Sequence, residues 1–144
     1  MVEQGDAVRY EPEPTPAGAP FWEATRERRL VLPWCRACEL PFWYPREICP
    51  RCLGDDLEWR PASGEGTVYA VSEQHRPMQP GLADRAPYPV VLVDLAEGVR
   101  MLSSVPPGAG PVGIGQPVTV AWEPLTDGRH LPLFTPAGSR AEPA

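Results

Sequence analysis

The stretch that decides the fold is residues 30–59, LVLPWCRACELPFWYPREICPRCLGDDLEW. Its four cysteines follow the pattern C-x2-C-x10-C-x2-C: Cys35, Cys38, Cys49 and Cys52. Two residues between cysteines let each pair form a tight turn that presents both thiolates to one ion. The spacing therefore predicts one Zn²⁺ held by four sulfur ligands. Iron in a rubredoxin-like centre takes the same ligand set, and buried free thiols or disulfides are the remaining alternatives.

A metal held by four thiolates is expected to be structural, because no coordination position is left open for an activated water. The segment that links the two cysteine pairs is long enough for a short hairpin, so a zinc ribbon is predicted. A segment this short and rich in proline cannot bury enough apolar surface alone, and metal removal should unfold it. Glu39 follows the first pair at a position where such turns often carry glycine, which predicts a slightly strained turn.

Short strand patterns dominate the sequence after Gly64. Strands are expected over 67–76, over 88–105 with a turn at Glu97-Gly98, over 117–125, and over 131–134 after a hairpin turn at Asp127-Gly128. The 21 Pro and 13 Gly of the chain disfavour a helical bundle and suit strands joined by turns. The predicted fold is mainly β, with a short N-terminal helix, a zinc ribbon and a five-stranded OB-fold barrel.

The predicted helix covers about 20–29, where Pro20 suits a first helical turn. The sequence then divides into a flexible acidic arm at 1–18, the helix and zinc ribbon at 19–60, the barrel at 61–136, and a flexible tail at 137–144. Ser63-Gly64-Glu65-Gly66 lacks the lysine of a phosphate-binding loop, and we interpret it as backbone geometry at the entry to the first barrel strand.

The formal net charge is −6 and the pI is near 4.9, which argues against a basic stripe for nucleic acid. A nucleic-acid-binding OB-fold module is therefore kept only as the alternative function. The longest purely apolar β-like run, 90–93, is far shorter than a membrane span, and no signal-peptide pattern opens the chain. A cytoplasmic location without membrane contact is expected, where four cysteines favour a metal over disulfides.

These segments resemble, in order, the helix, zinc ribbon and OB-fold barrel of the DUF35 family. The resemblance covers about residues 19–136, and its most specific parts are SGEGTVY at 63–69 and the ending from Asp127-Gly128 to LPLF. All four metal positions are intact, so the resemblance carries over the zinc site. Glu39 stands where many members have glycine, which affects the turn more than the ligands.

Members of this family accompany thiolase-like enzymes that act on acyl-CoA thioesters. In one branch the DUF35 unit is fused to or associated with a hydratase of steroid side-chain breakdown and joins a thiolase-like aldolase. In another it bridges a thiolase and a hydroxymethylglutaryl-CoA synthase and helps hold CoA. The resemblance, nearer to the first branch, implies a non-catalytic accessory subunit of an acyl-CoA lyase or thiolase complex. Such a subunit would stabilise its partner and help form an acyl-CoA site, with a CoA thioester as a shared ligand.

Two histidines and two arginines are further candidates for a functional role. His75 and His130 lie near no recognisable nucleophile motif, so they are expected to be a polar strand residue and a loop residue, and no catalytic residue is assigned. Arg46 and Arg51 in the ribbon could meet CoA phosphates, although a solvated surface is the more ordinary role for arginine.

Large aromatic side chains are crowded around the predicted ribbon. They are Phe21, Trp22, Phe42, Trp43 and Tyr44. Some should pack the helix on the ribbon, but their number exceeds what a ribbon core readily hides. Because aromatic residues are enriched at interface centres, we expect part of this cluster to form a partner interface.

Overall fold

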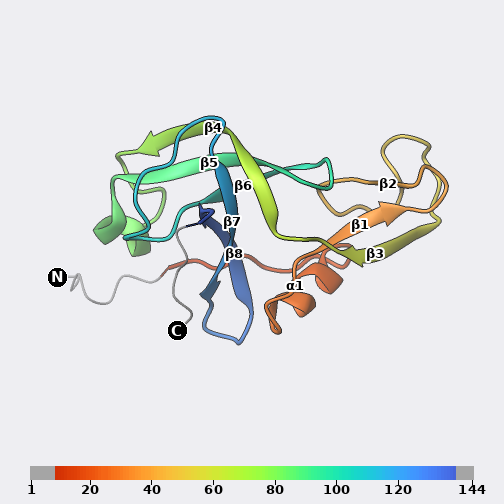
Figure 1. Cartoon of the computed structure of the whole chain (residues 1–144). Coiled ribbons are helices and arrows are strands. Elements are labelled where there is room, and N and C mark those ends of the chain that lie inside the picture. The colour runs from red at the N-terminus through yellow and green to blue at the C-terminus, as the bar shows by residue number, and fades with distance from the viewer. Residues whose placement is uncertain (1–8, 139–144) are drawn as a thin grey trace.

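Two antiparallel sheets, one of three strands and one of five, make up most of the computed structural model (Figure 1). The structure describes residues 9–138, so the outer part of the predicted arm, 1–8, and most of the predicted tail, 139–144, lie outside the described residues. The elements are α1 Ala19–Thr25, β1 Val31–Cys35, β2 Leu40–Pro41, β3 Leu57–Pro61, β4 Glu65–Gln74, the 3-10 helix η2 Pro80–Arg85, β5 Tyr88–Leu95, β6 Arg100–Ser104, β7 Pro117–Pro124 and β8 His130–Pro136. The predicted fold class is confirmed.

Helix α1 ends at Thr25, four residues before the predicted end at 29. Arg28 takes a left-handed backbone conformation with φ 56°, which a continuing helix does not permit. The N–H groups of Arg28 and Arg29 turn back to the carbonyls of Thr25 and Ala24, at 2.9 and 3.1 Å, and close the helix end. Pro20 lies in the first turn as predicted.

The five predicted barrel strands are present, in the order β6-β5-β4-β7-β8. A register shift between Val68 and Ala70 marks a bulge in β4, which helps this ten-residue strand bend. The sheet curls until its end strands β6 and β8 approach each other, where the Ser103 hydroxyl donates to the Pro132 carbonyl at 2.7 Å. No backbone ladder joins β6 to β8 within residues 9–138, so the barrel is partly open.

Two glycines at the start of β4 are required by close packing. A Cβ on Gly66 would lie 2.6 Å from Cγ1 of Val93, and one on Gly64, whose φ is +84°, would lie 2.7 Å from Cγ1 of Val120. These distances are shorter than carbon atoms tolerate, which supports the interpretation of this segment as backbone geometry.

One hydrophobic core runs through both sheets. Phe21 of α1 and Leu32 of β1 belong to the same buried cluster as Val68, Val93 and Phe134 of the barrel. Helix α1 packs against β1 on one side and β8 on the other (Figure 1). The ribbon is therefore fixed to the barrel through shared apolar packing. No helix within residues 9–138 has the length and apolar character needed to cross a membrane.

Candidate metal centre and partner surface

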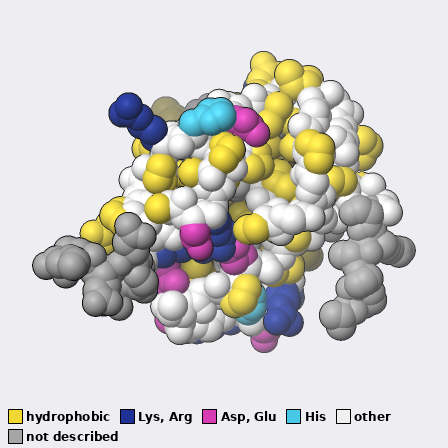
Figure 2. All heavy atoms as spheres, turned by 90° about the vertical axis from the view of Figure 1, so that its left-hand side faces the viewer, with side chains coloured by type: hydrophobic (Ala, Val, Ile, Leu, Met, Phe, Trp, Pro, Cys, Tyr) yellow, Lys and Arg dark blue, Asp and Glu magenta, His cyan; other side chains and the backbone are white. Residues whose placement is uncertain are grey.

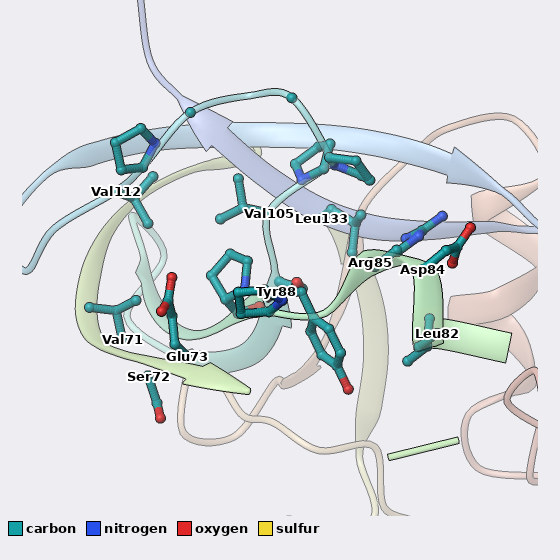
Figure 3. Close-up of a pocket in the computed structure, with 18 of the residues that line it drawn as sticks. Val71, Ser72, Glu73, Leu82, Asp84, Arg85, Tyr88, Val105, Val112 and Leu133 are labelled. Atoms are coloured by element: carbon teal, nitrogen blue, oxygen red, sulfur yellow. Dashed lines mark hydrogen bonds between the residues drawn. The ribbon is translucent and has the colours of Figure 1, made fainter. Parts of the chain in front are cut away.

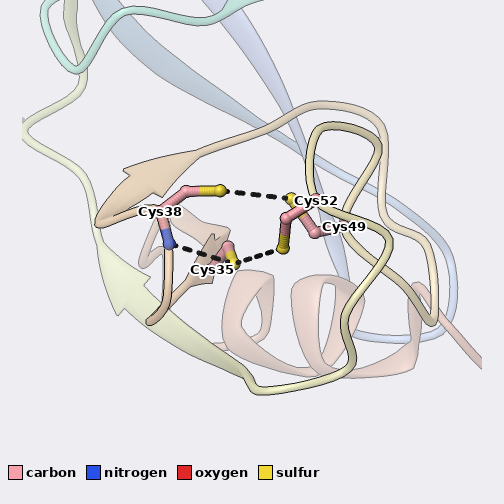
Figure 4. A group of neighbouring side chains, drawn as sticks. All are labelled: Cys35, Cys38, Cys49 and Cys52. Carbon is pink, nitrogen blue, oxygen red and sulfur yellow. Dashed lines mark hydrogen bonds between the residues drawn. The ribbon is translucent and has the colours of Figure 1, made fainter.

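The two cysteine pairs form equivalent turns that face each other (Figure 4). Cys35 ends β1, and the N–H of Glu39 donates to its carbonyl at 2.8 Å. In the second turn the N–H of Leu53 donates to the carbonyl of Cys49 at 2.9 Å. Strand β2 then pairs antiparallel with β1, so the short hairpin forms around the first cysteine turn and not within the linking segment, where the sequence predicted it.

The four sulfur atoms have the spacing of a tetrahedral metal site. Cys35 and Cys52 Sγ lie 3.7 Å apart, Cys38 and Cys49 Sγ lie 3.9 Å apart, and all four lie within 4.8 Å of one another. A tetrahedron with Zn–S bonds of about 2.3 Å has edges of about 3.8 Å. A disulfide needs about 2.05 Å, so all four cysteines are free and positioned to bind one metal ion.

Backbone N–H groups point at the sulfurs. Those of Cys38 and Arg51 donate to the Sγ atoms of Cys35 and Cys49, at 3.4 and 3.3 Å. Hydrogen bonds from the backbone of Cys52 and Arg51 hold the pKa of Cys49 at about 6, against the effect of burial. Burial raises the pKa of Cys38 to about 11. The metal-free site therefore keeps a proton on Cys38 that a bound cation would have to displace.

The arginines around the centre mostly bond within the ribbon. Arg36 binds the carboxylates of Asp56 and Glu58, at 2.7 and 3.1 Å. Nη2 of Arg51 donates to the carbonyl of Pro41 at 2.9 Å, which ties the second turn to β2. Arg46 is exposed. Of the two arginines predicted to contact CoA, Arg46 is exposed to solvent, whereas the guanidinium of Arg51 already donates a hydrogen bond within the ribbon.

The predicted aromatic cluster divides between core and surface. Phe21 and Phe42 are buried, at 4% and 3% exposure. Trp22 and Trp43 are half-buried and Tyr44 is 51% exposed. These last three line a groove of about 550 Å³ between the ribbon and strands β6 and β8. The indole N–H of Trp43 is buried and has no hydrogen-bond partner among residues 9–138. The groove is thus aromatic. We call it the aromatic groove.

His130 is not the loop residue that the sequence predicted. It begins β8 and is buried at 9% exposure. Its Nδ1 lies 2.8 Å from the carbonyl of Thr25, and its backbone N–H donates to Thr25 Oγ1 at 3.1 Å. This pair joins α1 to β8. His75, predicted to be a strand residue, lies one residue beyond the end of β4 and is exposed, with its Nε2 3.4 Å from Oε1 of Glu73.

A larger pocket of about 830 Å³ lies toward the barrel end away from the ribbon, and no sequence pattern predicted it. Its walls come from six separate segments of the chain: Arg9, the end of β4, η2, the start of β5, the end of β6 with the loop after it, and β8 (Figure 3). Residues this far apart in sequence carry no shared motif, so only the folded structure brings them together. We call it the barrel pocket.

Comparison with known proteins matches both parts of this structure to one family. The family model "ChsH2, rubredoxin-like zinc ribbon domain" matches residues 22–58, and "ChsH2, C-terminal OB-fold domain" matches residues 59–123. A chain of the solved structure "Ltp2-ChsH2(DUF35) aldolase" is 35% identical with a TM-score of 0.78, covering 88% of this chain and 99% of that one. The chain belongs to the DUF35 family.

Two curated relatives of this DUF35 chain have names from acyl-CoA metabolism. The "Probable enoyl-CoA hydratase alpha subunit" of Thermomonospora curvata is 38% identical over 85% of this chain. The "3-oxo-4,17-pregnadiene-20-carboxyl-CoA hydratase alpha subunit" of Mycobacterium tuberculosis is 41% identical over 44% of it. The DUF35 chain spans only 38% and 24% of these two relatives. It corresponds to one portion of each.

Proposed function

We propose that this chain is a non-catalytic accessory subunit that binds a thiolase-like acyl-CoA aldolase or thiolase, stabilises it and helps form its acyl-CoA site. The observation that carries the proposal is the likeness to the DUF35 chain of the Ltp2-ChsH2 aldolase, which is matched over nearly its whole length. The pregnadiene-carboxyl-CoA relative supports steroid side-chain thioesters, cleaved by a retro-aldol reaction, as the substrate class.

The four cysteines are proposed to hold a structural Zn²⁺. The sulfur spacing and the match to a zinc-ribbon family support this assignment. The ion would fix the two turns and so position the adjoining surface of the ribbon. We also propose the division into a helix-plus-ribbon unit at 19–60 and a barrel at 61–136, which act together as the docking unit.

The aromatic groove is the proposed contact with the aldolase. Half-buried tryptophans with an exposed tyrosine have the composition of an interface centre. Phe42 would support the groove from below, whereas Phe21, which is only 4% exposed, forms part of the groove lining.

The test is co-expression of the chain with an Ltp2-type aldolase, followed by purification on a tag carried by one of the two. Tyr44→Glu and Leu102→Glu, both on exposed groove residues, should weaken the complex at least tenfold. Ile114→Glu is the matched control, since Ile114 is 74% exposed and does not line the groove. An aldolase that is fully active and stable without this chain would contradict the proposal.

A CoA contact at Arg46 and Arg51 is the finer part of the proposal. Guanidinium groups bind phosphate in a bidentate way, and Arg46 is exposed for such a contact. In the assembled complex, Arg46→Ala should raise the KM for the acyl-CoA several-fold with little change in kcat. Arg28→Ala, another exposed arginine, is the control. An unchanged KM would remove Arg46 from the site.

A further inference from the structure

The barrel pocket has the size and walls of a ligand site. Its volume of about 830 Å³ lies within the range of roughly 300–1,000 Å³ that is usual for small-molecule pockets. Figure 3 shows Val71 and Glu73 on one side and Asp84 and Arg85 on the other, with Leu133 between them. Hydrophobic side chains also spread over much of this end of the molecule in Figure 2.

The walls favour a rigid apolar ligand. Five prolines contribute to the lining: Pro87, Pro89, Pro106, Pro107 and Pro111. Proline has a fixed φ and no N–H, so these walls are stiff and offer few donors. Val71, Val105, Val112 and Leu133 add β-branched and aliphatic surface. A stiff apolar wall complements a ligand that has little conformational entropy to lose on binding.

The charges around the pocket favour a neutral ligand. Arg85 Nη1 binds Glu123 Oε1 at 2.9 Å, and Arg9 binds the other oxygen of the same carboxylate. Both cations in the lining therefore share one carboxylate that is only 13% exposed, and together with Glu73 and Asp84 these two arginines and three carboxylates carry a net charge of −1. The remaining charges of the lining, Glu73 and Asp84, are negative and would repel a phosphate.

The pocket wall is held in place by a strap from the N-terminal side, residues 9–12. The Tyr10 N–H donates to the Gln79 side chain. The backbone of Arg9 packs closely on Gly81, because a Cβ added to Gly81 would lie 2.5 Å from the Cα of Arg9. Glu11 accepts from the Thr126 N–H at 3.1 Å. The strap thus joins η2 to the β7–β8 hairpin and fixes this side of the cavity.

From the size of the pocket, its proline-rich walls and its lack of net positive charge, we infer that the barrel pocket binds the uncharged fused-ring body of a steroid. The substrate class rests on the proposed function, whereas the pocket itself belongs to this chain alone. The nucleotide end of a steroid thioester would stay outside, because both arginines of the lining already hold Glu123 and the acidic Glu73 and Asp84 would repel its phosphates. This assigns to the barrel a substrate contact next to the aromatic groove, with which the pocket shares Ser104, Leu131 and Leu133.

The experiment is a titration of the zinc-loaded full chain with progesterone, a neutral four-ring steroid, followed by amide NMR shifts and calorimetry. Saturable binding with a Kd of order 10 µM is expected for a ligand of this size. The shifts should fall on the end of β4, η2 and the loop after β6. Decanoate, an anionic flexible chain, should bind at least tenfold more weakly.

Two variants and two controls locate the site. Leu82→Glu and Val112→Glu, in different walls, should each weaken progesterone binding at least tenfold. Ala83→Glu and Ile114→Glu are the controls, because both residues are exposed and neither lines the pocket. The thermal midpoint of each variant checks its folding, and the Leu82 variant serves if the half-buried Val112 variant unfolds.

Any one of four results would overturn the inference. The first is the absence of saturable progesterone binding, and the second is a set of NMR shifts confined to the aromatic groove. The third is equal affinity for decanoate, and the fourth is a loss of progesterone affinity in the control variants as large as that in Leu82→Glu and Val112→Glu. The co-purification experiment decides the proposed function separately. A complex that forms normally while the free chain binds no steroid would remove only the pocket assignment.

Discussion

Glu39 and Leu53 occupy equivalent positions, each directly after the second cysteine of its turn. Their φ values are 58° and 63°, in the left-handed region where a side chain costs about 1–2 kcal/mol. The sequence indicated strain at Glu39, and the structure shows the same geometry at Leu53, one residue before Gly54. Both side chains are exposed, so the metal turns and not packing interactions impose this conformation.

Replacing either residue with glycine should therefore stabilise the zinc-loaded protein. Relief of the left-handed conformation outweighs the added entropy of unfolded glycine, for a net gain of about 0.5 kcal/mol in the free energy of unfolding. Urea denaturation of Glu39→Gly and Leu53→Gly measures this gain. Ala37→Gly is the control: Ala37 is exposed in the first turn without a positive φ, and its replacement should cost about 0.5 kcal/mol. Equal effects at Ala37 and Leu53 would contradict the argument.

At the scale of elements, α1 depends on one buried hydroxyl. Thr25 is fully buried, and its Oγ1 donates to the Trp22 carbonyl at 2.6 Å and accepts the His130 N–H at 3.1 Å. A seven-residue helix is too short to be stable alone. Its position against β8 therefore follows from this link and from the burial of Phe21.

Thr25→Val keeps the side-chain shape but leaves the buried His130 N–H without an acceptor. This should lower the free energy of unfolding by about 1–3 kcal/mol, measured by urea denaturation. Thr135→Val, on the half-buried Thr135 of the same strand β8, should change it by less than about 0.5 kcal/mol. An unchanged free energy of unfolding in Thr25→Val would show that apolar packing alone holds the helix.

The ribbon is expected to respond to metal removal in two parts. Leu32 at its base lies in the shared core, whereas Leu40, Ile48 and Leu53 near the sulfurs are exposed. Chelation should therefore abolish amide protection over about 35–56, while β4 and β5 stay protected. Hydrogen exchange with and without chelator, beside a metal analysis giving one zinc per chain, checks this. Loss of protection across the whole barrel would contradict it.

At the scale of the whole molecule, Glu123 joins segments that are distant in the sequence. It binds Arg9 of the N-terminal strap and Arg85 of η2 from a half-buried position on β7. A charged hydrogen bond of this kind contributes about 1.5–3 kcal/mol where it is shielded from water. Both segments therefore depend on a single carboxylate.

Glu123→Gln should loosen the strap and η2 together. Amide exchange over 9–12 and 80–85 is expected to rise at least tenfold, while β5 and β6 are unchanged. Glu73→Gln is the control, because Glu73 is an exposed residue at the same pocket whose ion-pair partner is His75. Independent behaviour of the two segments would show that Glu123 does not couple them.

The parts of this molecule that sequence could predict are those set by local pattern. The cysteine spacing identified the sulfur cluster, and alternation such as Val91, Val93 and Leu95 identified the strands. The parts it missed depend on contacts between distant residues. His130 looked like a loop residue because its partner, Thr25, lies 105 positions away. The barrel pocket could not be predicted for the same reason, because its lining residues come from segments far apart in the sequence.

Strand β3 has a consequence for how such chains can be divided. The ribbon match ends at residue 58 and the barrel match begins at 59, yet Leu57–Pro61 is one strand paired along its length with β1. A cut there, or at the proposed limit between 60 and 61, would divide a hydrogen-bonded strand and expose Leu32 and Phe21 to water, so the two units are parts of one folded body. Gene fusions and expression fragments should therefore keep the zinc ribbon and the barrel together as one unit.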